Sequence, residues 1–119
     1  MAAQIAIGFA VFVVTVATTV STLDIGLRAI SPPRPPLGLG RLNLALAGAA
    51  AAALAALTIA IWVWAAAFYV LGVFAAVEPS VYFAAVAFTT LGFGDVLLPI
   101  EWRLLSGLCA ANGLIVFGL

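Results

Sequence analysis

The chain has 119 residues, of which 67% are hydrophobic and only 7% are charged, with four basic and four acidic residues in balance. A water-soluble domain of this size needs far more polar surface, so lipid is the expected solvent for most of the protein. With no histidine and one cysteine, the sequence excludes a Ser-His-Asp triad and an internal disulfide and argues against a Cys/His zinc site, so we expect no enzyme activity.

The first predicted element is an N-terminal transmembrane helix over residues 1–22. The run from Gln4 to Val20 carries no charge and is about long enough to cross a bilayer core. A signal peptide is the alternative, but the run lacks a basic start and no clear small-residue cleavage site follows it. We therefore interpret it as a true membrane helix.

Residues 23–42 are predicted to form a polar link. Its centre, residues 31–36, has the sequence Ser-Pro-Pro-Arg-Pro-Pro, which favours polyproline II over helix. A stiff connector at the membrane surface is the preferred interpretation, and a docking site for a proline-binding domain is the alternative. The link holds three of the four arginines, Arg28, Arg34 and Arg41, so the positive-inside rule places it in the cytoplasm and the N-terminus outside.

The uncharged run from Asn43 to Val77 predicts a second spanning helix. As a continuous helix it would be about 50 Å long, against a bilayer core of about 30 Å. It must therefore tilt, extend past the lipid or break near Gly72. Its alanine-rich stretch, residues 49–56, permits close packing against another helix but is equally compatible with a face turned to lipid.

A short helix is predicted to begin at Pro79, because proline suits a first helical turn and Glu78 favours the positive end of the helix dipole. Residues 80–89 are too few to span a membrane, and a glycine-containing segment follows them. This order predicts a re-entrant loop, which the arginine distribution places on the outer side. Residues 102–119 then form a third span of about 27 Å.

Residues 89–95, Thr-Thr-Leu-Gly-Phe-Gly-Asp, form the most informative motif in the sequence. Glycine adopts positive φ without a steric penalty, which allows successive backbone carbonyls to point to the same side. The motif resembles the selectivity filter of potassium channels, usually Thr-Val-Gly-Tyr-Gly-Asp, in which carbonyl oxygens replace the hydration shell of the ion. A glycine turn that merely joins two helices is the structural alternative.

The resemblance to a potassium-channel pore domain covers about residues 43–119, and the chain looks like a small bacterial three-span member of the two-pore-type ion-channel family. It implies an all-α membrane protein with an outer helix, a re-entrant pore helix carrying the selectivity filter, and an inner helix. Here an extra N-terminal helix precedes them. Residues 112–119 resemble the inner helix around its hinge glycine, which makes Gly113 a possible gating hinge; packing with Gly107 is the alternative. Since the chain ends about one turn past Gly113, we expect the inner helix to be truncated.

The resemblance also implies residue roles at the filter. The filter itself would consist of Thr90, Leu91, Gly92, Phe93 and Gly94. The backbone carbonyls of the first four would bind potassium, and the Thr90 hydroxyl would add an inner ring of oxygens. Asp95 would surround the outer mouth and concentrate cations.

The sequence departs from the usual family pattern around this filter. Phe93 replaces the usual tyrosine, so its ring cannot donate a hydrogen bond to aromatic groups behind the filter. Tyr82 and Phe83 stand where a tryptophan pair often braces it, and Val86 stands where some members carry a glutamate that pairs with the aspartate matched by Asp95. We expect selectivity to survive and the bracing of the filter to be reduced.

Two kinds of polar side chain fall inside the predicted spans. Asn112 is expected to hydrogen-bond another helix, with a cavity or gating role as the alternative. Thr15, Thr18 and Thr19 are expected to bond to the backbone of their own helix.

Together these features predict a potassium-selective channel subunit, multi-pass in the cell membrane, that conducts potassium passively with its filter facing outside. One chain supplies a quarter of a pore, so a homotetramer is expected. The alternatives are a weakly selective cation channel and a non-conducting structural or assembly membrane protein. The expected partners are other copies of the chain and the lipid bilayer, without nucleic acid, and no cofactor is expected beyond the permeant potassium ion.

Overall fold

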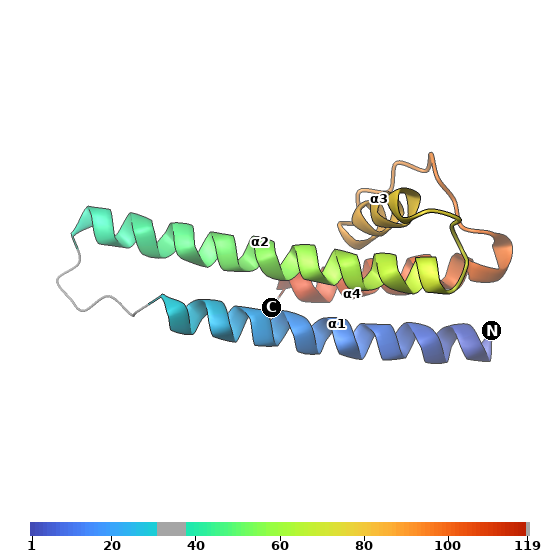
Figure 1. The fold of residues 1–119 in the computed structure, drawn as a ribbon, viewed down its shortest axis with the longest axis horizontal. Coiled ribbons are helices and arrows are strands. Elements are labelled where there is room, and N and C mark those ends of the chain that lie inside the picture. Colours follow the sequence, from blue (N-terminus) through green and yellow to red (C-terminus); the bar gives the residue numbers. More distant parts are fainter. Residues whose placement is uncertain (31–37, 119) are drawn as a thin grey trace.

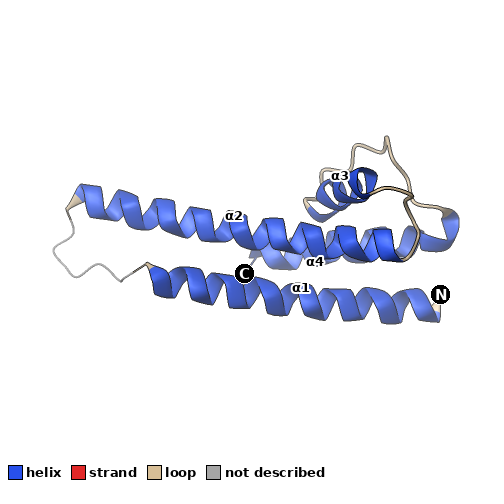
Figure 2. Cartoon of the chain, viewed as in Figure 1, coloured by secondary structure: helices blue, strands red, loops and turns tan. Residues whose placement is uncertain are grey.

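The computed structural model describes residues 1–30 and 38–118, and all regular structure in those ranges is helical (Figure 1, Figure 2). The elements in chain order are α1 (Ala2–Ala29), α2 (Leu39–Val70), α3 (Val77–Phe88), the 3-10 helix η1 (Ile100–Trp102) and α4 (Arg103–Gly118). By length and composition, three helical segments within these ranges can cross a membrane: α1, α2 and Ile100–Gly118. The prediction of an all-α membrane protein is confirmed.

The first helix continues past its predicted end to Ala29, so the first part of the link predicted over 23–42 is helical. The charges do not end the helix because Asp24 and Arg28 lie one turn apart and form an ion pair, with 2.8 Å between Oδ2 and Nε. The proline-rich stretch of the link, including Arg34, lies outside the described residues.

The second helix begins at Leu39, earlier than the predicted Asn43. Its 32 residues span about 48 Å at about 1.5 Å per residue. It ends at Val70, just before Gly72, whose φ of +68° is disfavoured for residues with a Cβ. The break near Gly72, one of the three outcomes predicted for this long apolar run, is therefore confirmed.

Small residues set the distance between α1 and α2. A Cβ added to Gly26 would lie 2.6 Å from the Cβ of Ala52, so the backbone of α1 at Gly26 packs directly against the Ala52 methyl group of α2. Ala56 and Ala60 on the same face of α2 are buried, whereas Ala51, Ala53 and Ala55 are exposed. The alanine-rich stretch thus serves both predicted roles, with one face packed on α1 and the other open.

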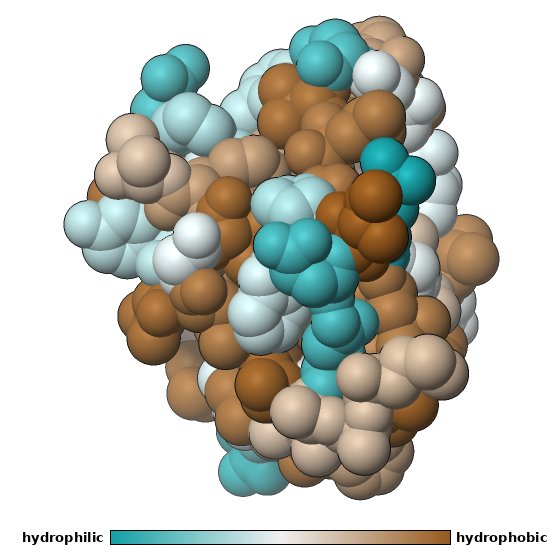
Figure 3. Space-filling view, turned by 90° about the vertical axis from the view of Figure 1, so that its right-hand side faces the viewer, coloured by the Kyte–Doolittle hydropathy of each residue, from teal (hydrophilic) through white to brown (hydrophobic). Residues whose placement is uncertain are grey.

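α1 packs against α2 and α4, and α3 packs against the same two helices. α1 and α2 are antiparallel, α4 lies beside α1 and runs in the same direction, and α3 lies on the opposite side of α2 and α4 from α1 (Figure 1). α3 enters the bundle from the end where α2 finishes, and the segment after it returns to that same end, where α4 begins (Figure 1). Viewed onto this end, the surface is brown and apolar with teal hydrophilic patches (Figure 3).

Aromatic side chains fix α3 against α2. The ring of Phe68 lies 5.3 Å from that of Phe83, edge to face, and 5.7 Å from that of Trp64. Phe74, in the turn between the two helices, closes the group at 5.5 Å from Phe83. Such pairs stabilise a fold by about 0.5–1.5 kcal/mol each beyond the effect of their buried area, so this group fixes the position of the short α3 against α2.

Candidate functional site

The predicted site is carried by the C-terminal end of α3. The helix starts at Val77, two residues before the predicted Pro79, after Ala76, whose extended backbone has φ −136° and ψ 159°. Glu78 therefore lies in its first turn rather than just before it. It ends at Phe88, after which the N–H of Thr89 still donates to the carbonyl of Ala85 at 3.1 Å. The motif therefore begins at the point where the helix dipole is negative, inside the bundle.

The backbone of the motif alternates in conformation. The φ angles of Thr90, Gly92 and Gly94 are +60°, +59° and +77°. Positive φ at every second residue is the arrangement that turns successive carbonyls toward one side of an extended segment. The glycines were predicted to take this role. The positive φ of Thr90 was not predicted, and a conformation that costs of order 1–3 kcal/mol in a residue with a Cβ is typical of functional segments.

The loop is held to α3 by backbone hydrogen bonds. The N–H of Gly92 donates to the carbonyl of Val86 at 3.3 Å, and that of Thr90 donates to the carbonyl of Ala87 at 3.0 Å. The Thr90 hydroxyl donates to the carbonyl of Thr89 at 2.6 Å, which leaves its own oxygen lone pairs free to accept. Val86 thus braces the loop through its backbone carbonyl.

A side-chain hydrogen bond holds the far end of the loop. The hydroxyl of Tyr82 donates to Oδ2 of Asp95 at 2.5 Å. This bond lowers the pKa of the Asp95 carboxyl from its ordinary 3.8, and the same bond raises the pKa of the Tyr82 hydroxyl above 10.0. Tyr82 was expected at a position that braces the loop, but its partner Asp95 was not predicted. A tyrosine on a short helix followed by an aspartate just beyond the glycines was the available signal.

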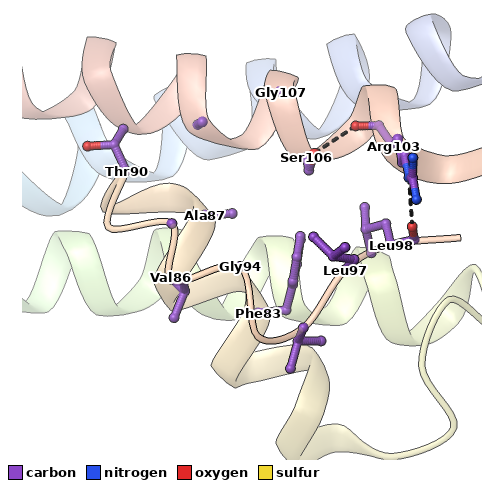
Figure 4. Close-up of a pocket in the computed structure, with 13 residues that line it drawn as sticks. Phe83, Val86, Ala87, Thr90, Gly94, Leu97, Leu98, Arg103, Ser106 and Gly107 are labelled. Atoms are coloured by element: carbon purple, nitrogen blue, oxygen red, sulfur yellow. Dashed lines mark hydrogen bonds between the residues drawn. The ribbon is translucent and has the colours of Figure 1, made fainter. Parts of the chain in front are cut away.

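A cavity of about 550 Å³ separates the loop from α4 (Figure 4). The residues that line it are mostly small or apolar: Phe83, Val86, Ala87, Thr90, Gly92, Gly94, Val96, Leu97, Leu98, Arg103, Ser106, Gly107 and Ala110. At its end, Nε of Arg103 donates to the carbonyl of Leu98 at 3.4 Å, and the Ser106 hydroxyl donates to the carbonyl of Arg103 at 2.7 Å. These bonds fix the return segment to the start of α4.

Gly113 lies directly beneath the motif. A Cβ placed on it would be 1.7 Å from the carbonyl oxygen of Phe88, the last residue of α3. Of the two glycines in the predicted packing alternative, only Gly113 is closely packed within the described residues, because a Cβ on Gly107 would have no atom within 4 Å. α4 therefore approaches the base of the motif closely only because residue 113 has no side chain.

The structure gathers the predicted site residues on one loop. Thr90, Leu91, Gly92, Phe93 and Gly94 form its exposed length, Asp95 lies at its outer end, and Gly113 supports its base. The side chains of Leu91 and Phe93 are 57% and 66% exposed.

Comparison with known proteins gives the family. A family model described as "Ion channel" matches residues 56–119, which is more than half of the chain. The chain belongs to this ion-channel family. No curated protein and no solved structure matches it. The matched segment contains the C-terminal part of α2, all of α3, the loop and α4, whereas α1 lies outside it.

Proposed function

We propose that this ion-channel protein conducts potassium selectively and passively, and that the loop after α3 is its selectivity filter. The alternation of positive φ at Thr90, Gly92 and Gly94 carries the proposal. A dehydrated cation needs a continuous set of oxygen ligands, and a backbone of this kind offers carbonyls at each step without any charged side chain. Several adjacent sites of moderate affinity allow ions to enter and leave quickly.

Each part of the loop has a distinct role in this proposal. The carbonyls of Thr90, Leu91, Gly92 and Phe93 form successive potassium sites, and the Thr90 hydroxyl adds an inner ring. The C-terminal end of α3 places the negative pole of its dipole at the inner end of the filter, which favours a cation there. Asp95 concentrates cations at the outer mouth, and the hydrogen bond from the Tyr82 hydroxyl lowers the pKa of its carboxyl.

The proposal requires four copies of the chain. One loop supplies only one wall of a pore, and a fourfold axis along the loop would complete it. The exposed side chains support this assembly: Leu91, Phe93 and Leu97 are 57%, 66% and 67% exposed, and neighbouring copies would cover them. In the membrane, the loop and the N-terminus face outside and residues 23–42 face the cytoplasm.

A flux assay on liposomes that contain the purified protein tests this function. We expect potassium to pass and sodium to be excluded. The Gly92→Ala variant should lose the flux, because its φ of +59° is strained for any residue with a Cβ. Gly40→Ala is the matched control, since a Cβ there meets no atom within 4 Å.

Three outcomes contradict the proposal. Sodium flux equal to potassium flux would indicate a weakly selective cation channel. Full flux in Gly92→Ala would refute the filter assignment. A stable monomer without flux would indicate a structural membrane protein.

A further inference from the structure

Within the described residues, α2 and α4 make no substantial contact with each other. Each of them packs against α1 and α3 instead, so the four helices form a closed ring in the order α2, α1, α4, α3. α1 lies outside the segment that matches the ion-channel family, whereas the other three helices lie wholly or partly inside it. A helix from outside the family segment therefore forms one of the two connections between α2 and α4.

α2 presents a different face to each of its two partners. Its alanine-rich face packs on α1, where the Ala52 methyl group meets the backbone at Gly26. Its aromatic face packs on α3, where the ring of Phe68 lies 5.3 Å from that of Phe83. Both contact faces of α2 are occupied in this way, and the position of α4 therefore depends on α1 and α3.

α4 makes one close contact with each of these two helices. A Cβ on Gly8 of α1 would lie 2.3 Å from Cδ1 of Leu108 and 3.2 Å from Cδ2 of Leu105, so both leucines lie directly on the backbone of α1. On its other side, α4 meets the carbonyl of Phe88, the last residue of α3, at Gly113. In both contacts a glycine lets the helices approach more closely than a side chain would allow.

The two supports differ in how far they reach along α4. α3 ends at Phe88, level with Gly113, and the ring of Phe88 reaches a little further, to 6.3 Å from that of Phe117. α1 runs in the same direction as α4 and has more residues after Gly8 than α4 has after Leu105, so it continues beside α4 to the end of that helix (Figure 1). α1 is therefore the longer of the two supports.

We propose that α1 is a positioning helix, which holds α4 at a fixed distance from α2 and thereby keeps Gly113 against the base of the loop. Gly8 and Leu108 are the positioning residues, because their contact sets how closely α4 approaches α1. Leu108 and Gly113 are separated by about 8 Å of continuous helix, so a displacement of α4 at Leu108 is passed on to Gly113.

A disulfide across the contact tests its geometry in the full-length protein. Gly8→Cys and Leu108→Cys are combined with Cys109→Ala, which removes the native thiol. The Cβ position of Gly8 lies 3.5 Å from Cγ of Leu108, and disulfides join Cβ atoms about 3.5–4.5 Å apart, so oxidation should protect both thiols from labelling. In the control pair, Phe9→Cys replaces Gly8→Cys, and no cross-link should form because Phe9 is 66% exposed. Equal cross-linking of both pairs, or none in either, would overturn the contact.

Amide hydrogen exchange tests the positioning role without a measurement of conduction. Gly8→Val should push α4 away from α1 and accelerate exchange in residues 88–92, at the base of the loop, by at least about threefold. Adding Leu108→Ala removes the side chain that the valine meets, and exchange should return toward that of the unmodified protein. Gly107→Val is the matched control, since its Cβ meets no atom within 4 Å, and it should leave residues 88–92 unchanged.

Unchanged exchange in residues 88–92 of folded Gly8→Val would overturn the positioning role, and so would an acceleration that Leu108→Ala does not reverse. If Gly8→Val does not fold, Gly8→Ala replaces it with the same two outcomes, because its Cβ already reaches Leu108.

The consequence for conduction rests on the proposed function. Potassium flux per amount of folded protein should fall by at least about threefold in Gly8→Val and recover when Leu108→Ala is added. Full flux in Gly8→Val would overturn the link between α1 and conduction. Absence of flux in the unmodified protein would instead contradict the proposed function, while cross-linking and exchange still decide whether α1 positions α4.

Discussion

The loop after α3 and the hairpin of α1 and α2 are built in opposite ways. The loop consists of backbone in unusual conformations, held by a few hydrogen bonds, and its side chains are largely exposed. The hairpin is regular helix packed through small residues, with Gly26 against Ala52 at its closest point. The loop carries a recognisable motif and the family match, whereas α1 carries neither.

The two regions differ in how directly the sequence identifies them. A site made of backbone atoms requires particular residues, so glycines and their spacing identify it directly. Helix packing in lipid requires only small residues at the contact, and many sequences satisfy that requirement. At Gly113, α4 touches the base of the loop. Substitutions at this contact, in the hairpin and in the loop test how differently the regions respond.

The largest effect is expected from Gly113→Ala. The new Cβ would lie 1.7 Å from the carbonyl oxygen of Phe88, a backbone atom that cannot move without displacing α3. Overpacking of this kind costs typically about 1–3 kcal/mol and more where backbone must shift, so we expect a destabilisation at or above the top of that range. Thermal unfolding in detergent measures it. Gly107→Ala, with open space at its Cβ, should be neutral or slightly stabilising, and equal loss in both variants would contradict the contact.

Gly26→Ala should destabilise the hairpin by a moderate amount. Its Cβ would lie 2.6 Å from that of Ala52, and the two helices must separate by a small distance to admit it. We expect a loss of about 1–3 kcal/mol in the free energy of unfolding. Ion flux per amount of folded protein should change less than in Gly113→Ala. Ala51→Gly, on the exposed face of α2, controls for changes in helix propensity, and a stability unchanged in Gly26→Ala would show that the helices are not in close contact here.

A smaller and local effect is expected from Tyr82→Phe. The variant loses the hydrogen bond to Asp95, while the ring and the packing of α3 remain. Amide hydrogen exchange should accelerate in residues 92–96 and remain unchanged in α2. Tyr69→Phe, on the exposed side of α2, should alter neither region. Unchanged exchange in the loop of Tyr82→Phe would show that this bond does not brace the loop.

The smallest effect is expected from pH within the ordinary range. The hydrogen bond from Tyr82 lowers the pKa of Asp95. The stability that this bond contributes is therefore present above pH 3.8 and is lost as pH falls through the lower pKa of the folded state. The pKa of Tyr82 is raised, so its contribution is present below pH 10.0 and is lost only as pH rises through the higher folded value. Loop exchange and flux should therefore be flat between about pH 5 and 9 after correction for intrinsic exchange. A transition near pH 7 would contradict this assignment.

Much of the fold follows from local sequence. Uncharged runs of sufficient length give the membrane helices, Gly72 marks the end of α2, and Glu78 with Pro79 marks the start of α3. The motif of residues 89–95 predicts the loop and the positive φ of Gly92 and Gly94. The helix ends were less predictable. The charges of Asp24 and Arg28 indicated a polar link in the sequence, but the two side chains form an ion pair within α1.

The contacts between distant residues were not predictable from one sequence. The tyrosine on α3 and the aspartate beyond the glycines were only a weak signal for the bond between Tyr82 and Asp95, and nothing local indicates that Gly113 meets the carbonyl of Phe88. The expectations that Asn112 bonds to another helix and that Thr19 bonds to the backbone of its own helix are wrong, because neither side chain has a hydrogen-bond partner among the described residues. These relations are set by packing, which sequence spacing within one helix does not determine.

The central claim, that the loop after α3 binds potassium in a tetramer, is tested most directly by an experimental structure of the assembled protein determined in potassium. The account predicts four loops around one axis, with ion density between the carbonyls of Thr90, Leu91, Gly92 and Phe93. Loops that do not meet, or an axis without ion density in potassium, would contradict it.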